Sequence, residues 1–314
     1  MDETIDNELF TDAPGEPTFF ALSHTRSLRP GQVGLVGVPV DALVTERRGA
    51  AEAPDVLRRR SARTGGYSIS DGAMRKRRSA GVDLGNLPVD ASTPPDELFD
   101  AVRRTVSAIC SAGALPLMVG GDHSITYPAV TALAEKHGPL RIIQIDAHVD
   151  ATDPAEWDCR WNHGTWLRNL IEDGAVEGPD VLQIGVRDFQ YSESGPSFAA
   201  GHGVVTVTPE QYAAEGPEAI LNGLHDAAER PVYVTLDIDA VDPAFAPGTG
   251  EPMPGGLTSR EVLGLVRGVF GSGLSVVGAD LVEVVPAWDC AEMTAALATN
   301  LLAEMTDGLA EGME

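Results

Sequence analysis

The stretch Ile142-Ile143-Gln144-Ile145-Asp146-Ala147-His148-Val149-Asp150 decides the fold, because it joins an apolar run to a set of polar groups. The apolar run is typical of a strand in a parallel sheet, where both faces are covered. Side chains of an extended chain alternate, so Asp146, His148 and Asp150 should point to the same side. Ligands of open α/β sheets bind at the carboxyl ends of the strands. The stretch therefore indicates a ligand site, although a polar loop after a strand explains this motif alone equally well.

The composition places the chain among globular α/β proteins. Its 314 residues, 43% hydrophobic and 22% charged, suit one large domain or two smaller ones. The formal net charge of −25 argues against a nucleic-acid partner, since a phosphate binder needs a basic face. A negative field would attract cationic substrates, but solubility or salt adaptation explains the bulk charge better.

The termini and the cysteines exclude further classes of protein. No apolar run approaches the length of a membrane span, and the acidic N-terminus lacks the pattern of a signal peptide. We therefore expect a cytoplasmic protein without a membrane partner. Cys110, Cys159 and Cys290 are too scattered for a disulfide framework or a C-x-x-C pair. Any metal site must then be built from nitrogen and oxygen ligands.

Apolar runs and helical patterns alternate along the chain. We expect strands at residues 33–38, 81–85, 115–119, 140–145, 181–186, 204–207, 232–239 and 274–285. Helices are expected at residues 95–113, 125–136, 217–229, 258–270 and 291–305. Such alternation indicates βα units with right-handed crossovers. The prediction is a three-layer α/β/α fold around a mainly parallel sheet of about eight strands.

Two segments near the N-terminus differ from this pattern. Residues 1–31 are polar and contain proline, and we expect an irregular arm whose Phe19-Phe20 pair packs against the single domain at 32–314 or against a neighbouring subunit. Residues 44–79 are rich in arginine. A solvated helix face explains this arginine group better than ion pairs within or between subunits.

Metal-capable side chains follow three of the expected strands. They are His123, Asp146, His148, Asp150, Asp237 and Asp239. Buried carboxylates repel each other, so such a group calls for a cationic guest. Six nitrogen and oxygen ligands exceed the needs of one ion and favour two ions of a hard or borderline metal such as manganese. Two ions about 3.5–4 Å apart can bridge a water and make it a hydroxide nucleophile near neutral pH.

Three motifs together resemble the signatures of the ureohydrolase family, which includes arginase and agmatinase. The motifs are Gly120-Gly121-Asp122-His123-Ser124, Asp146-Ala147-His148-Val149-Asp150 and the segment from Asp237 to Gly250, which contains Asp242-Pro243 and Ala246-Pro247-Gly248-Thr249-Gly250. The resemblance extends from about Val33 to the C-terminus. It implies a three-layer α/β/α fold, a binuclear manganese centre and hydrolysis of a guanidino group to urea and an amine, in homotrimers or homohexamers.

The resemblance also assigns roles to residues by position. One ion would be held by His123, Asp146, Asp150 and Asp237, and the other by Asp146, His148, Asp237 and Asp239. His163 matches a loop histidine that shuttles protons, and Glu283 matches the glutamate that pairs with the substrate guanidinium; with Asp150 they form the expected catalytic set.

Both assigned roles make chemical sense. A carboxylate can hold a guanidinium bidentately and orient it, and a histidine near its ordinary pKa suits proton transfer to the departing amine. Without the resemblance, a loop histidine bonded to a backbone carbonyl would explain His163 equally well. For Glu283 the alternative explanation is a buried ion pair, and it is weaker than the alternative for His163.

The substrate is less defined than the reaction. The segments His163-Gly164-Thr165 and Gly248-Thr249-Gly250 resemble agmatinase, guanidinobutyrase and proclavaminate amidinohydrolase more than arginase, which favours agmatine or 4-guanidinobutanoate. The loop Glu46–Pro54 departs from the Arg-Pro-Gly and Gly-Pro pattern of the family. The residues Trp157, Trp161, Met253 and Trp288 either shape an aromatic pocket or pack at a subunit interface.

Two alternatives to this reading stay open. One is a hydrolase of a small guanidine, a biguanide or a formimino compound, with nickel in place of manganese. The other is a non-catalytic subunit that keeps the fold. The complete ligand set together with His163 and Glu283 argues against the second alternative, since such a subunit would be free to lose them.

Overall fold

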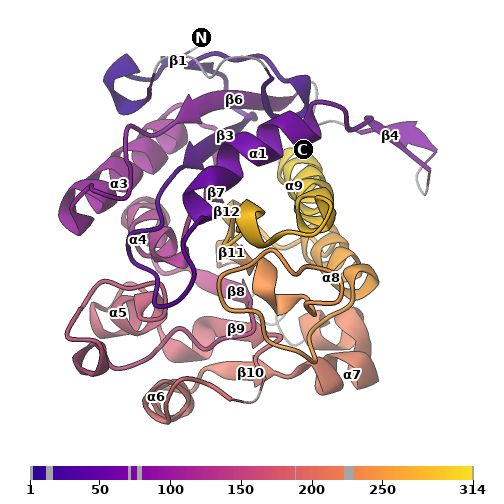
Figure 1. The fold of residues 1–314 in the computed structure, drawn as a ribbon. Helices are drawn as coiled ribbons and strands as arrows, with labels where there is room; N and C mark the ends of the chain where they lie inside the picture. The colour runs from indigo at the N-terminus through magenta and orange to yellow at the C-terminus, as the bar shows by residue number, and fades with distance from the viewer. Residues whose placement is uncertain are drawn as a thin grey trace.

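One parallel sheet of eight strands forms the centre of the molecule, in the order β10-β9-β8-β11-β12-β7-β3-β6 (Figure 1). The computed structural model describes residues 3–11, 17–69, 72–75, 80–187, 189–222 and 230–312. The strands are β3 (Val33–Val38), β6 (Gly81–Asn86), β7 (Leu115–Gly120), β8 (Arg141–Ile145), β9 (Val181–Ile184), β10 (Val205–Val207), β11 (Val232–Asp237) and β12 (Val276–Val282).

Helices cover both faces of this sheet (Figure 1). They are α1 (Ala53–Ser61), α3 (Pro95–Ser111), α4 (Thr126–His137), α5 (Trp166–Glu172), α6 (Ser194–Gly201), α7 (Pro209–Asn222), α8 (Ser259–Gly271) and α9 (Met293–Glu311). Helices α1, α7, α8 and α9 contribute to one hydrophobic core, and α3, α4, α5 and α6 contribute to another. The three-layer α/β/α prediction is therefore confirmed.

Strand β8 explains why the sheet needs both layers. Ile143 and Ile145 belong to one core, whereas Ile142 belongs to the other, and all three are fully buried. Each such side chain contributes about 1.5–3 kcal/mol when it leaves water. A strand with apolar groups on both faces is stable only between two layers of helices.

Element boundaries differ from the expected ones where the chain turns into the site. The strand expected at 232–239 ends at Asp237, because Asp237 accepts the amide of Asp239 (2.8 Å) and residues 238–240 form a 3-10 turn. The strand expected at 274–285 ends at Val282, before Glu283 with φ 61°. Helix α7 begins at Pro209, but its backbone is non-helical at Gly216 (φ 77°, ψ 164°), and the second part starts at Pro217, where the expected helix begins. Residues 223–229 of the expected helix lie outside the described residues.

The described part of the N-terminal arm packs on the domain. Strands β1 (Glu3–Thr4) and β2 (Ser27–Leu28) pair in antiparallel fashion, and Phe19 and Phe20 are fully buried. The amide of Phe19 donates to Asp83 of β6 (2.9 Å). The arm therefore shares its core with the domain behind it.

The arginine group is only partly solvated, which corrects the expected helix face. Arg58 of α1 is buried and its Nε lies 2.9 Å from Asp83. Arg59 is exposed as expected. Arg77 and Arg78 lie outside the described residues. No helix of the described ranges combines the length and apolar character needed to cross a bilayer.

Candidate metal centre and active site

The site lies at the carboxyl ends of four neighbouring strands, β8, β11, β12 and β7. His123 follows β7, Asp146 follows β8, Asp237 ends β11 and Glu283 follows β12. The turn before His123 depends on Gly121, because a Cβ there would stand 2.0 Å from the carbonyl oxygen of Val40. The topology thus brings together residues that are far apart in the sequence.

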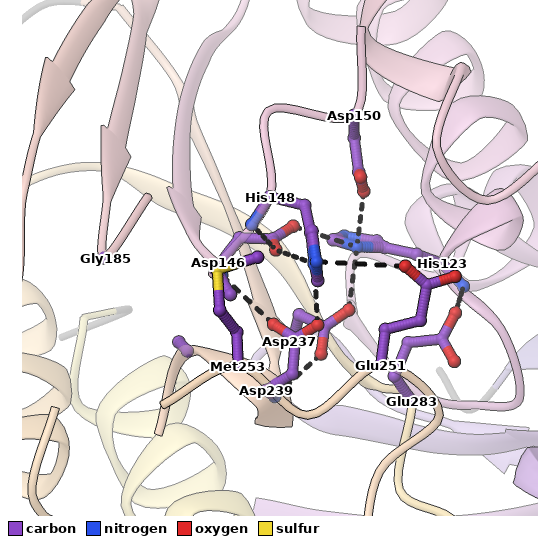
Figure 2. A network of polar contacts seen from close by, with 12 residues as sticks. His123, Asp146, His148, Asp150, Gly185, Asp237, Asp239, Glu251, Met253 and Glu283 are labelled. Atoms are coloured by element: carbon purple, nitrogen blue, oxygen red, sulfur yellow. Dashed lines mark hydrogen bonds and ion pairs between the residues drawn. The ribbon is translucent and has the colours of Figure 1, made fainter. Parts of the chain in front are cut away.

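His123 points one ring nitrogen at three carboxylates (Figure 2). Its Nδ1 lies 3.2 Å from Asp146, 3.0 Å from Asp150 and 3.3 Å from Asp237. This nitrogen is buried and makes no hydrogen bond within the described structure. Its Nε2 lies 2.7 Å from Thr235 Oγ1, and a bond donated there leaves the Nδ1 lone pair free to bind a cation.

His148 forms a second group that shares Asp146 with the first. Its Nδ1 lies 2.8 Å from Asp239 and 3.7 Å from Asp146. The sets His123, Asp146, Asp237 and Asp146, His148, Asp239 each bring their ligand atoms within 4.8 Å of one another. All six residues expected as ligands therefore converge, and Asp146 belongs to both sets.

Polar side chains of the sheet hold Asp146 in place. Gln144 Nε2 donates to Asp146 Oδ2 (2.8 Å), and Gln183 Nε2 donates to Gln144 Oε1 (2.9 Å). Gln144 and Gln183 pair in register on β8 and β9. The amide of His148 donates to the other oxygen of Asp146 (2.7 Å). The shared carboxylate is thus fixed on both sides.

Without a cation, the charges of this cluster are in conflict. Burial raises the pKa of Asp150 to about 6, with a further increase from Asp146. Burial, Asp239 and Asp146 raise the pKa of Asp237 well above its usual range. Burial opposes the charge of His123 as well, but the surrounding carboxylates raise its pKa well above the ordinary value. The carboxylate oxygens and imidazole nitrogens of this cluster, His123 Nδ1 among them, are suitable ligands for divalent cations.

His163 lies between two glutamates at the edge of the cluster. Its Nδ1 is 2.9 Å from Glu283 Oε1, which also accepts the amide of His123 (2.9 Å). Its Nε2 accepts the amide of Thr45 (3.1 Å) and lies 3.3 Å from Glu251 Oε1. Burial lowers the pKa of His163, but Glu283 and Glu251 outweigh it and raise this pKa well above the ordinary value.

Glu251 is a site residue that the sequence did not single out. Its Oε2 lies 3.8 Å from His148 Nε2 (Figure 2). The Thr45 hydroxyl donates to its other oxygen. Burial raises the pKa of Glu251, but His163 and Thr45 lower it to about 2. The only signal was its place after Gly248-Thr249-Gly250 in a proline-rich loop.

Of the four side chains expected to shape the pocket, only Trp157 lines it within the described structure. Trp161 packs against Phe99 and Tyr127 instead, with ring centroids 5.0 and 4.9 Å away. Trp288 lies under the Arg47 guanidinium, 4.7 Å from it. The pocket is small, about 50 Å³, and its lining is Thr45, His148, Asp150, Thr152, Trp157, His163, Gly164, Gln190, Tyr191, Asp237, Asp239, Glu251 and Glu283.

Comparison with known proteins places this site in a family. The sequence profile of the arginase family matches residues 31–307. Proclavaminate amidinohydrolase of Streptomyces clavuligerus is 39% identical, over 96% of this chain and 96% of that protein. Guanidinopropionase of Pseudomonas aeruginosa is 38% identical, over 95% of this chain and 92% of that protein. The solved structure of the S. clavuligerus enzyme superposes with a TM-score of 0.86 at 37% identity, covering 95% of this chain and 98% of that one. These matches confirm the resemblance: the chain belongs to the arginase family.

Proposed function

We propose that the chain hydrolyses a guanidino substrate to urea and an amine at a binuclear metal centre. The observation that carries the proposal is the pair of ligand groups that share Asp146. The proposed ligands are His123, Asp146, His148, Asp150, Asp237 and Asp239. The names of the relatives, which are amidinohydrolases and guanidino hydrolases, support the reaction class.

Manganese is the proposed ion, and nickel is the alternative. The donors are nitrogen and oxygen without thiolate, which suits a hard or borderline octahedral ion. When bound, such a pair supplies a water whose pKa is lowered toward neutrality, and so a nucleophile at physiological pH. The remaining tasks of binding, orientation and proton transfer fall to side chains of this chain.

Glu283 is proposed to hold the guanidinium. Its carboxylate is buried at the end of β12 and already accepts the His163 ring and the His123 amide. A guanidinium offers planar pairs of N–H donors that match a carboxylate and would be oriented toward the ligand cluster. Orientation of this kind lowers the barrier because the reacting carbon cannot turn away.

His163 is proposed to carry a proton to the departing nitrogen. Hydrolysis of a guanidinium transfers both protons of the attacking water to that nitrogen, which leaves as an ammonium, while the oxygen stays in urea. His163 Nδ1 lies 2.9 Å from Glu283 Oε1, so its ring stands beside the bound guanidinium. Glu283 and Glu251 raise the pKa of His163 well above the ordinary value that the sequence led us to expect, so the ring holds a proton that it can give to the departing nitrogen.

The experiment is urea release by manganese-loaded protein with agmatine, arginine, 4-guanidinobutanoate, guanidine and a biguanide. A formimino compound is tested in parallel by formamide release. We expect release from at least one guanidino substrate, and loss of it in Asp146→Ala and His163→Ala proteins that keep the circular dichroism of the parent. Nickel-loaded protein is the matched comparison for the metal. Full activity in both variants would place the reaction elsewhere.

We also propose a homotrimer or homohexamer as the working assembly. The support is the family to which the chain belongs. Light scattering coupled to gel filtration measures the mass directly, and a monomer of 33.0 kDa would contradict this part of the proposal.

A further inference from the structure

Glu251 lies at the outer end of the row of charged groups that line the pocket. Its side chain is 26% exposed, compared with 17% for His148, 11% for His163 and 5% for Glu283. The inner groups face the proposed cations and the guanidinium. Glu251 is therefore the ionic group that meets whatever part of a substrate extends toward the mouth.

The carboxylate of Glu251 is held by its neighbours rather than free to swing away. Its Oε1 accepts from the Thr45 hydroxyl and lies 3.3 Å from His163 Nε2. Its Oε2 lies 3.8 Å from His148 Nε2, a contact that Figure 2 shows. These contacts come from the loops after β3, β8 and β11. A charge fixed in this way acts on a ligand without first being ordered by it.

No lysine or arginine stands among the described residues that line the pocket. Arg187 is near, but its guanidinium donates to the carbonyl oxygens of Gly185, Asp239 and Met253. Arg47 stacks on Trp288. A substrate tail that ends in a carboxylate would thus meet Glu251 without a lysine or arginine to pair with, and like charges at short range cost binding energy.

Aromatic side chains also line the pocket. Trp157 and Tyr191 both line the pocket, and their ring centroids are 5.0 Å apart. Trp157 lies against Gly164, where an added Cβ would stand 2.8 Å from the indole. Aromatic faces attract cations and leave anions unsatisfied. The aromatic rings and Glu251 therefore both favour a positive charge on the substrate tail.

We propose that Glu251 is a specificity-determining residue that selects guanidino substrates with a positively charged tail over guanidino acids. The inference rests on the proposed function and favours guanidino amines such as agmatine over guanidino acids such as 4-guanidinobutanoate. A guanidino amine places its guanidinium on Glu283 and its ammonium between Glu251 and the Trp157–Tyr191 pair. A guanidino acid of the same length would place a carboxylate there.

The experiment compares three guanidines that differ in the end of the tail: agmatine with an ammonium, butylguanidine with a methyl group and 4-guanidinobutanoate with a carboxylate. The parent protein is compared with Glu251→Gln, which keeps the shape and the acceptor for Thr45 but removes the charge. Glu97→Gln, an exposed position on α3, makes the same change in net charge away from the pocket. The readouts are kcat/KM for urea release and calorimetric Kd.

In the parent we expect the order ammonium, methyl, carboxylate, from best to worst. Glu251→Gln should lower the ratio of ammonium to carboxylate kcat/KM by roughly 10–100-fold, the range of a hydrogen bond to a charged group. Glu97→Gln should leave this ratio unchanged. Glu251→Gln can also lower kcat equally for all three substrates, because Glu251 contacts His163. Such an equal loss leaves the ratio of ammonium to carboxylate kcat/KM unchanged, and this ratio is the readout.

Two results would overturn the inference. One is a parent that prefers the carboxylate tail, and the other is a ratio that Glu251→Gln does not change. If no guanidine releases urea, the proposed function fails, and the calorimetric order of the three ligands still decides the role of Glu251. Tighter binding of agmatine, lost in Glu251→Gln, would support it, and equal binding of all three would contradict it.

Discussion

At the scale of single residues, two carboxylates of the candidate site have a strained backbone. Asp150 and Glu283 have φ values of 51° and 61°, a conformation that costs a non-glycine residue roughly 1–2 kcal/mol. Hydrogen bonds hold both residues in this conformation. Trp166 Nε1 donates to Asp150 Oδ2 (2.7 Å), and the amide of Glu283 donates to the carbonyl oxygen of Gly121 (2.9 Å). Strain that the surrounding bonds maintain in this way points to a geometry that the site requires.

Glu283→Gln tests the proposed guanidinium contact at this scale. The amide keeps the size of the side chain but loses the charge that pairs with a guanidinium, so kcat/KM should fall by about 10²–10³-fold. The melting temperature should change little, because the replacement keeps an oxygen acceptor for the His123 amide. Urea release and thermal unfolding measure both. An unchanged kcat/KM would remove Glu283 from the mechanism.

The cysteines provide a test of local burial and its effect on ionisation. Burial raises the pKa of the Cys110 thiol to about 11, although Lys136 lowers it. Its thiolate therefore forms only as the pH rises toward that value, so at pH 8 it should resist iodoacetamide. Cys159 and Cys290 are exposed and should react. Mass spectrometry should find Cys110 alkylated only after unfolding; rapid labelling of native Cys110 would contradict its buried position.

At the scale of elements, one ion pair joins α1, β6 and the N-terminal arm. Arg58 pairs with buried Asp83 and with exposed Asp55. Asp83→Asn should lower the free energy of unfolding by about 3–5 kcal/mol, because it leaves a buried guanidinium without its partner. Asp55→Asn, the matched control, should cost less than about 1 kcal/mol. Urea denaturation measures both, and equal losses would argue against a buried pair.

The sequence predicts best the elements whose apolar residues follow a regular strand or helix pattern without interruption. Strand β8 and helix α3 follow directly from such patterns. Helices α5 and α6 were not expected, because α5 is short and α6 contains glycine and proline near its start. For α1, the sequence predicted a solvated helix face, and the burial of Arg58 could not be anticipated from it. The convergence of the proposed ligand residues could be anticipated because period-two motifs at neighbouring strand ends lie close together. Glu251 could not, since its contacts depend on three loops that meet only in the folded chain.

At the scale of the whole molecule, a bound cation should couple the site to stability. The site joins four strands of the sheet, and its buried carboxylates repel one another without a cation. If the proposed site holds manganese, the ion should raise the melting temperature over that of protein stripped of metal by a chelator. The increase should grow with metal concentration, because the ion binds only the folded chain. Asp146→Ala, which removes the shared ligand, should abolish most of this increase. An equal increase in both proteins would mean that manganese binds elsewhere.

The most direct test of the binuclear centre is urea release as a function of manganese added to protein that a chelator has stripped of metal. The proposed binuclear centre predicts that activity rises with added metal and levels off at about two equivalents per chain, as two ligand sets sharing Asp146 require. Metal content by mass spectrometry should reach the same value. Full activity at one equivalent, or full activity without metal, would contradict the binuclear centre.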